Sequence, residues 1–130
     1  MSTEAHQTTL STLEDRIRRE LTALPAESVP ELARMVERVV AALQPERVYV
    51  FGSQARGDAS PDSDVDLLVV VPMSDLLPHR MDHAAYEAIG PHNMSIDVLV
   101  MTAPEFERRS RARSSLPSTV LREGRLLYAA

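Results

Sequence analysis

Three short apolar runs constrain this chain most, because each has the length and the β-branched character of a strand. The runs are Arg47–Phe51 (RVYVF), Val65–Val71 (VDLLVVV) and residues 95–101 (SIDVLVM). Apolar residues at helical spacing occupy the segments around them, so strands and helices are mixed along the chain. This order predicts an α/β (α+β) fold, in which a small mixed β-sheet has helices packed on it.

The helices are predicted from apolar spacing and from capping residues. We expect them over residues 9–24, 28–43, 75–89 and 116–123, with a further helix capped by Thr102 and a short final strand at 126–128. Ser28, followed three residues later by Glu31, has the spacing of a capping box. Leu76 and Leu77 are expected on the buried side of their helix.

The composition fits one ordinary domain. At 130 residues we expect a helical extension over residues 1–27 and the main domain over residues 28–130. The absence of cysteine excludes disulfides and thiolate chemistry. A net charge of −5 argues against direct nucleic-acid binding. The chain has neither a run of about 18 apolar residues nor a signal peptide, so we expect no membrane contact and a cytoplasmic location.

Gly52 and Ser53 follow the first strand directly, a placement typical of turns that bind phosphate. Glycine lets the backbone approach a ligand closely, and exposed N–H groups with a serine hydroxyl can hold phosphate oxygens. Glycine and serine after a strand are also an ordinary turn signal. The pair is therefore informative only together with its surroundings.

Asp64 and Asp66 stand at the head of the second strand, and Asp97 lies in the third. Residues i and i+2 of a strand project to the same face, so the first two carboxylates project together. Carboxylates this close repel one another, and a divalent cation such as Mg²⁺ relieves the repulsion. Asp97 joins them if the two strands are neighbours in matching register, which would give the three carboxylates of a two-metal site.

Each acid also has a plain structural explanation. An isolated DxD pair is more often a turn or strand-end feature than a metal site, and Asp97 alone would suit the edge of a strand. The order of the whole stretch is more specific, because a strand, GS, ten residues, DxD on a strand and an acid on a third strand follow one another. We therefore interpret the three aspartates as metal ligands.

This stretch resembles the minimal nucleotidyltransferases of the DNA polymerase β superfamily, whose pattern is GS, ten residues and DxD. It reads FGSQARGDASPDSDVDLLVV here, with the third acid in SIDVLV, and the resemblance spans about residues 30–128. The resemblance implies a polymerase β-like fold in which Asp64 and Asp66 bind two Mg²⁺ ions. It implies that Asp97 is the third carboxylate and a candidate base, and that Gly52 and Ser53 hold the triphosphate of ATP.

The resemblance describes the reaction better than the acceptor. Small free-standing members are antitoxins paired with HEPN-domain ribonuclease toxins, which implies transfer of AMP from ATP to a hydroxyl of such a toxin, with tyrosine as the expected acceptor. Two alternatives stay open: an antitoxin that acts by binding alone, and a nucleotidyltransferase with a small-molecule acceptor. The helix at 9–24 offers an apolar face to a partner, although packing on its own domain is the simpler explanation.

Two arginine features each have two explanations. Arg56 is suited to hold phosphates as a forked cation, and equally suited to pin its loop through Asp58. A basic cluster follows Thr102, and it suits RNA or an acidic partner, although a solvated face near a helix C-terminus is the plainer explanation. The cluster consists of Arg108, Arg109, Arg111 and Arg113.

Overall fold

A four-stranded mixed sheet forms the centre of the protein, with the strand order β3-β2-β1-β4. The strands are β1 (Arg47–Phe51), β2 (Val65–Val71), β3 (Ile96–Thr102) and β4 (Arg125–Ala129). β1 lies antiparallel between β2 and β4, whereas β2 and β3 are parallel. This computed structural model describes the backbone from residue 3 onward and the side chains from residue 12 onward.

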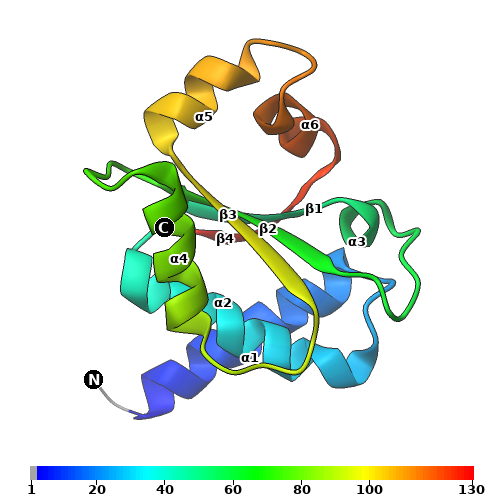
Figure 1. Cartoon of the computed structure of the whole chain (residues 1–130). Coiled ribbons are helices and arrows are strands. Elements are labelled where there is room, and N and C mark those ends of the chain that lie inside the picture. Colours follow the sequence, from blue (N-terminus) through cyan, green and yellow to red (C-terminus); the bar gives the residue numbers. More distant parts are fainter. Residues whose placement is uncertain (1–2) are drawn as a thin grey trace.

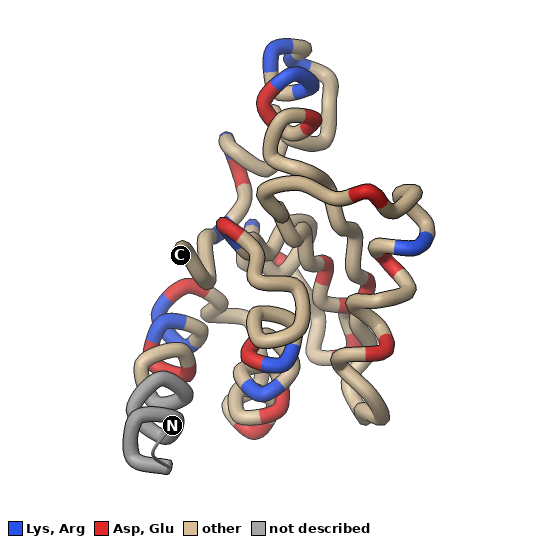
Figure 2. The backbone as a smooth tube through the Cα atoms, turned by 90° about the vertical axis from the view of Figure 1, so that its left-hand side faces the viewer, with Lys and Arg blue, Asp and Glu red and all other residues tan. Residues whose placement is uncertain are grey.

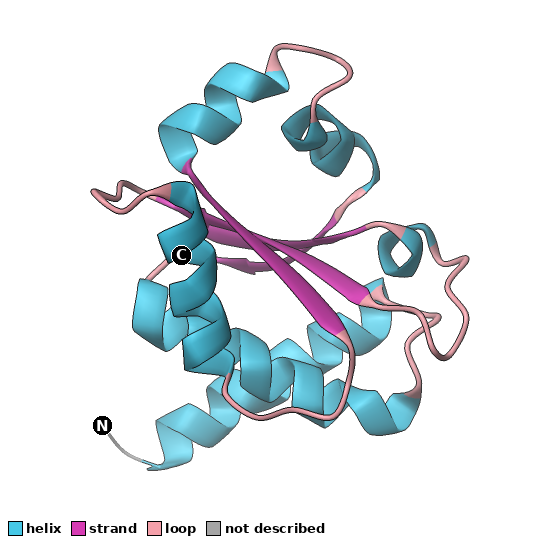
Figure 3. Ribbon diagram, viewed as in Figure 1, coloured by secondary structure: helices cyan, strands magenta, loops and turns pink. Residues whose placement is uncertain are grey.

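Helices cover both faces of the sheet (Figure 1). One face carries α1 (Thr3–Glu20), α2 (Val29–Leu43) and α4 (Pro78–Ile89), and the other carries α5 (Ala103–Ser110) and α6 (Leu116–Glu123). The remaining elements are the 3-10 turn η1 (Ala26–Ser28) and α3 (Ser53–Arg56). Figure 2 shows the connection between α5 and α6 at the end of the molecule far from α1, and Figure 3 shows the layers of helix, sheet and helix. No helix in the described part of the chain is long and apolar enough to cross a bilayer.

Alternation along the strands divides the core in two. Leu67 of β2 packs in the larger core, beneath α1, α2 and α4. Leu68 and Val70 point the other way and pack with Phe106 of α5 and Val120 of α6. β2 is therefore buried on both faces, which explains why its sequence is an almost continuous apolar run.

The strand predictions hold closely, whereas two helices begin or end elsewhere. β1 and β2 have the expected bounds. α1 ends at Glu20 rather than at residue 24, because residues 22–24 form a turn ahead of Pro25, and Leu21 and Leu24 reach the core from outside the helix. α4 begins only at Pro78, so Leu76 and Leu77 precede the helix and are exposed rather than buried. Among the described side chains of α1, from residue 12 onward, Leu13 and Ile17 pack into the larger core.

The predicted capping box at α2 is wrong. Ser28 makes no side-chain cap hydrogen bond, because it closes the turn η1 in a helical conformation rather than an extended one. Glu31 instead accepts the backbone N–H of Asn93 with its carboxylate at 2.8 Å, across 62 residues of sequence. The predicted cap of α5 is confirmed, since Thr102 Oγ1 accepts the N–H of Glu105.

Two side chains of α4 close the outer edge of β3. An edge strand leaves backbone N–H groups without a strand partner. The Tyr86 hydroxyl accepts the N–H of Val98 at 2.8 Å, and Asp82 Oδ1 accepts the N–H of Val100 at 2.7 Å. Residues 82 and 86 lie four apart on one side of the helix, which matches the spacing of successive outward donors on the strand.

Candidate active site

Asp66 and Asp97 meet in one row that crosses three strands. Asp66 of β2 is the register partner of Phe51 in β1 and of Asp97 in β3. Paired residues project to the same face, which here is the face that carries Leu68 and the α5–α6 layer. The two carboxylates are close enough for a side-chain hydrogen bond between them. The structure therefore supplies the matching register on which a joint role of these acids depends.

Asp64 lies near this pair but is exposed to solvent. It precedes β2 by one residue, and its charge acts on Asp66. Within the described residues, no group of three His, Cys, Asp or Glu side chains stands ready at the spacing of a metal site. The site therefore consists of the adjacent carboxylates of Asp66 and Asp97, with Asp64 at the entry of the strand.

The environment of Asp66 penalises its negative charge. Burial raises the pKa of Asp66 above its ordinary value of 3.8, and the nearby carboxylates of Asp97 and Asp64 raise it further, as does the hydrogen bond to Asp97. A divalent cation between these oxygens would remove the repulsion. The donors are all carboxylate oxygens, which Mg²⁺ prefers, so the residues present fit this ion.

The raised pKa of Asp66 predicts a pH-dependent instability that Mg²⁺ should relieve. A carboxyl whose pKa is higher in the folded state stabilises the fold at low pH, and that contribution is lost as the pH rises above 3.8 through the folded value. In EDTA, we therefore expect Asp66→Asn to raise the Tm relative to the wild type, by a margin that grows between about pH 4 and pH 7. Mg²⁺ should raise the Tm of the wild type but not that of Asp66→Asn. Calorimetric scans across this range measure both effects, and a Tm difference that ignores pH and Mg²⁺ would contradict the account.

Gly52 brings the backbone against the Asp66 carboxylate. Its φ of 76° and ψ of −155° lie in a region that is essentially restricted to glycine. A Cβ atom at this position would overlap Asp66 Oδ2. Ser53 follows as the first residue of α3, so the turn starts beside Asp66, and phosphate binding by this turn stays a prediction.

Arg56 adopts the loop-pinning arrangement of its two expected roles. Its Nε lies 3.2 Å from Asp58 Oδ2, and both side chains are largely exposed. An exposed pair of this kind contributes little free energy, so it does not commit Arg56 to this partner.

Two further residues at this end of the sheet were not predicted from the sequence. Gln54 is 1% exposed, and neither of its amide atoms has a hydrogen-bond partner among the described residues. Arg125 of β4 donates from Nε to the carbonyl oxygen of Ala55 at 3.2 Å and lies 3.9 Å from Glu20. The Arg125 contact joins residues 70 apart in sequence, and no local pattern signals such a contact.

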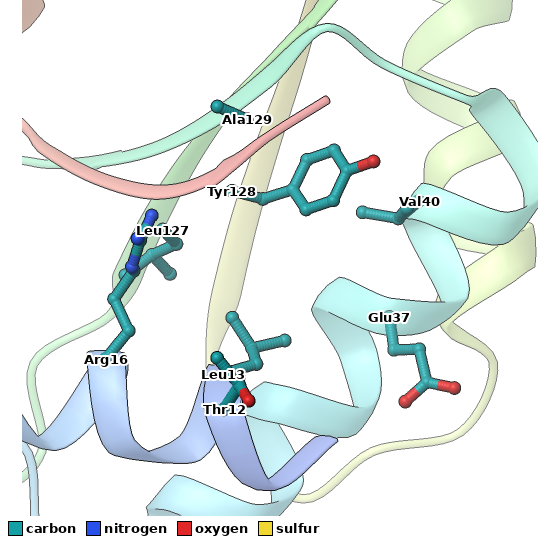
Figure 4. A pocket seen from close by; sticks show the side chains of 8 residues that line it. All are labelled: Thr12, Leu13, Arg16, Glu37, Val40, Leu127, Tyr128 and Ala129. Atoms are coloured by element: carbon teal, nitrogen blue, oxygen red, sulfur yellow. The ribbon is translucent and has the colours of Figure 1, made fainter. Parts of the chain in front are cut away.

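A cavity of about 320 Å³ lies on the opposite side of the sheet (Figure 4). Leu13 of α1, Val40 of α2, and Leu127 and Tyr128 of β4 contribute to its walls. Leu127 belongs to the core beneath α1 and α2, whereas the aspartates project toward α5 and α6. The cavity is therefore separate from the candidate active site.

Comparison with known proteins places the chain in a family. Residues 32–127 match the family model of the nucleotidyltransferase domain. The crystal structure of a Sulfolobus solfataricus protein assigned as a nucleotidyltransferase aligns with a TM-score of 0.50 and 26% identity, over 74% of this chain and 78% of that chain. A toxin–antitoxin structure with AMP-PNP aligns with a TM-score of 0.44 and 17% identity, over 74% and 72%. No curated protein matches significantly. With most of its length matched by the family model, and with the mixed sheet expected of that fold, this chain belongs to the nucleotidyltransferase domain family.

Proposed function

We propose that this protein is a Mg²⁺-dependent nucleotidyltransferase that transfers AMP from ATP to a hydroxyl group. The observation that carries the proposal is the row formed by Asp66 and Asp97, with the Gly52 backbone against the Asp66 carboxylate. Oxygen donors next to a phosphate-type turn are what a metal-bound triphosphate requires.

Each residue has a role that follows from its position. Asp64 and Asp66 would hold Mg²⁺, which when bound neutralises phosphate charge and polarises the reacting phosphorus. Gly52 and Ser53 would contact the triphosphate, and Arg56 would exchange its weak pairing with Asp58 for phosphate oxygens. The acceptor oxygen attacks the α-phosphorus, forming an O–P bond as the bond to pyrophosphate breaks. Asp97, which is exposed, would take the hydroxyl proton.

We extend the proposal to the acceptor, a tyrosine of a HEPN-family ribonuclease toxin that AMP transfer would silence, so that this protein acts as an antitoxin. The support is the resemblance of the FGSQARGDASPDSDVDLLVV stretch to minimal nucleotidyltransferases. The test incubates the protein with labelled ATP, Mg²⁺ and the product of the adjacent gene. Label on a tyrosine of that product is expected, and an unlabelled product would count against this acceptor.

A substitution separates this activity from neutralisation by contact alone. Asp64→Asn with Asp66→Asn keeps the shape of both side chains but removes the metal-binding charge. An antitoxin that only binds would still protect cells from the toxin, whereas the proposed enzyme would lose that protection. The measurement is colony formation with the toxin co-expressed.

Arg125→Gln is expected to weaken nucleotide binding without unfolding the protein. The substitution removes the hydrogen bond that fixes α3, which carries Ser53 and Arg56. A hydrogen bond of this type contributes about 1 kcal/mol, so we expect a KM for ATP raised roughly three- to tenfold with little change in kcat. Glu20→Gln is the matched control, because it removes the ion pair of Arg125 and leaves the bond to Ala55. Equal KM values for both variants would contradict this role.

A further inference from the structure

Arginine is concentrated in one segment of this acidic chain. Residues 103–123, which form α5, α6 and their connection, carry five arginines and three acids, whereas the rest of the chain carries nine arginines and 16 acids. Figure 2 shows basic residues at the α5–α6 end of the molecule, beside acidic residues of the same hairpin. This end therefore has a positive field although the net charge of the chain is −5.

Five exposed side chains make up what we call the arginine surface. They are Arg108, Arg109, Arg111, Arg113 and Arg122. Arg108 Nη2 and Arg109 Nη1 each lie 3.9 Å from Glu105 Oε1. An ion pair at this distance and exposure contributes little free energy. Arg111 and Arg113 form no ion pair with any residue in the described part of the chain. The five arginines exceed the three glutamates of the hairpin by two, so this surface keeps a net positive charge.

The hairpin that carries this surface has a fixed position. Arg122 Nη1 donates to the carbonyl oxygen of Arg113 at 3.2 Å and to Ser118 Oγ at 2.5 Å, which ties α6 to the preceding loop. Phe106 of α5 and Val120 of α6 are buried against the sheet. The arginines therefore stand on a packed support rather than on a free loop.

The arginine surface and the acids lie on the same side of the sheet. Phe106 and Val120 pack on the face to which Asp66 and Asp97 project. Leu99 projects to this face as well, two residues along β3 from Asp97, and is 41% exposed. A partner seated on the arginine surface thus lies on the face where transfer would take place, with an exposed apolar side chain to contact.

We propose that the arginine surface docks acidic residues that flank the acceptor residue of a protein and so presents the acceptor hydroxyl to the aspartates, an inference that rests on the proposed function. The positive field is local, whereas the remaining surface is acidic. A protein can match this pattern with a few acidic residues close to the acceptor residue. A nucleic acid carries charge along its whole length, so the acidic remainder would repel it.

Two side chains of the hairpin favour the same occupant. Phe106 is the one aromatic residue between residues 103 and 123, and it is buried at 3% exposure, so the hairpin offers no platform on which a base could stack. Leu121 is 54% exposed and directly precedes Arg122. Apolar contact beside arginine is typical of protein interfaces.

The test measures binding of three fluorescein-labelled probes by anisotropy at about 0.1 M salt, where charges more than roughly 10 Å apart are screened. The probes are a tyrosine peptide flanked by glutamates, its serine-flanked counterpart and a single-stranded RNA. The wild type is compared with R108Q/R109Q/R111Q/R113Q. A matched control, R18Q/R19Q/R34Q/R80Q, removes four exposed arginines from α1, α2 and α4.

We expect the acidic peptide to bind more tightly than its counterpart and than the RNA. The hairpin variant should raise the Kd of the acidic peptide about tenfold, and the control should leave it nearly unchanged. Equal losses in the two variants, or no binding of the acidic peptide, would overturn the inference. Tighter RNA binding that the hairpin variant abolishes would assign the surface to nucleic acid instead. Mg–ATP binding, measured in parallel, tests the proposed function separately, because no probe requires nucleotide.

Discussion

Asp66→Asn should lower the rate of nucleotidyl transfer by about a thousandfold while leaving the protein folded. Asn has the shape of Asp but lacks the charge that would hold Mg²⁺, and the reaction loses the stabilisation of its developing phosphate charge. Burial and the charges of Asp97 and Asp64 disfavour the ionised form of Asp66, so removing this carboxylate should also raise the Tm. A variant that gains stability and loses activity would separate the role of Asp66 in chemistry from any role in folding.

The control for this result is Asp62→Asn. Asp62 lies in the same loop and is exposed, but it is not among the residues that act on Asp66. It should retain activity within about twofold. Single-turnover transfer of labelled AMP measures both variants, and an Asp66→Asn enzyme within tenfold of the wild type would remove the metal-site interpretation.

Gly52→Ala is expected to impair both folding and activity. The new Cβ would overlap Asp66 Oδ2, and alanine does not tolerate the backbone conformation at this position. A residue forced into such a region costs about 1–3 kcal/mol, to which the displaced carboxylate adds a loss of at least about a hundredfold in transfer rate.

Gly57→Ala is the matched substitution. Gly57 also has a positive φ, at 81°, but a Cβ there would meet only Thr22 Oγ1 at 3.8 Å. It should show a modest loss of stability and nearly normal transfer. Urea unfolding and transfer assays on both variants check the comparison, and similar activities would show that the approach to Asp66 is unimportant.

Local patterns predicted the strands because their causes are local. The runs at β1 and β2 are short and rich in β-branched residues, which favour a strand over a helix. The observed bounds match the predicted ones. The Ser28–Glu31 capping box does not form because Ser28 closes η1 in a helical conformation, and Glu31 accepts instead the N–H of Asn93, which is distant in sequence. A capping motif reports only the local hydrogen bonds that two nearby residues can form, and it carries no information about partners that are distant in sequence.

The same limit applies to the site. The spacing of Asp64 and Asp66 follows from the chain itself, whereas the place of Asp97 depended on β3 lying parallel to β2 in register. Arg125 and Gln54 gave no signal, since one acts on a carbonyl group across the fold and the other is a buried amide in a short helix. Tertiary contacts of this kind require the assembled sheet.

Tyr86 and Asp82 occupy two backbone donors of the β3 edge, those of Val98 and Val100, and this limits where another chain can attach. An extended peptide that paired with β3 would have to displace both side chains from these N–H groups, which disfavours the addition of a strand at this edge. The opposite margin, β4, is separated from Asp97 by two intervening strands. Any association through added strands would therefore leave the neighbourhood of the aspartates open to solvent and substrate.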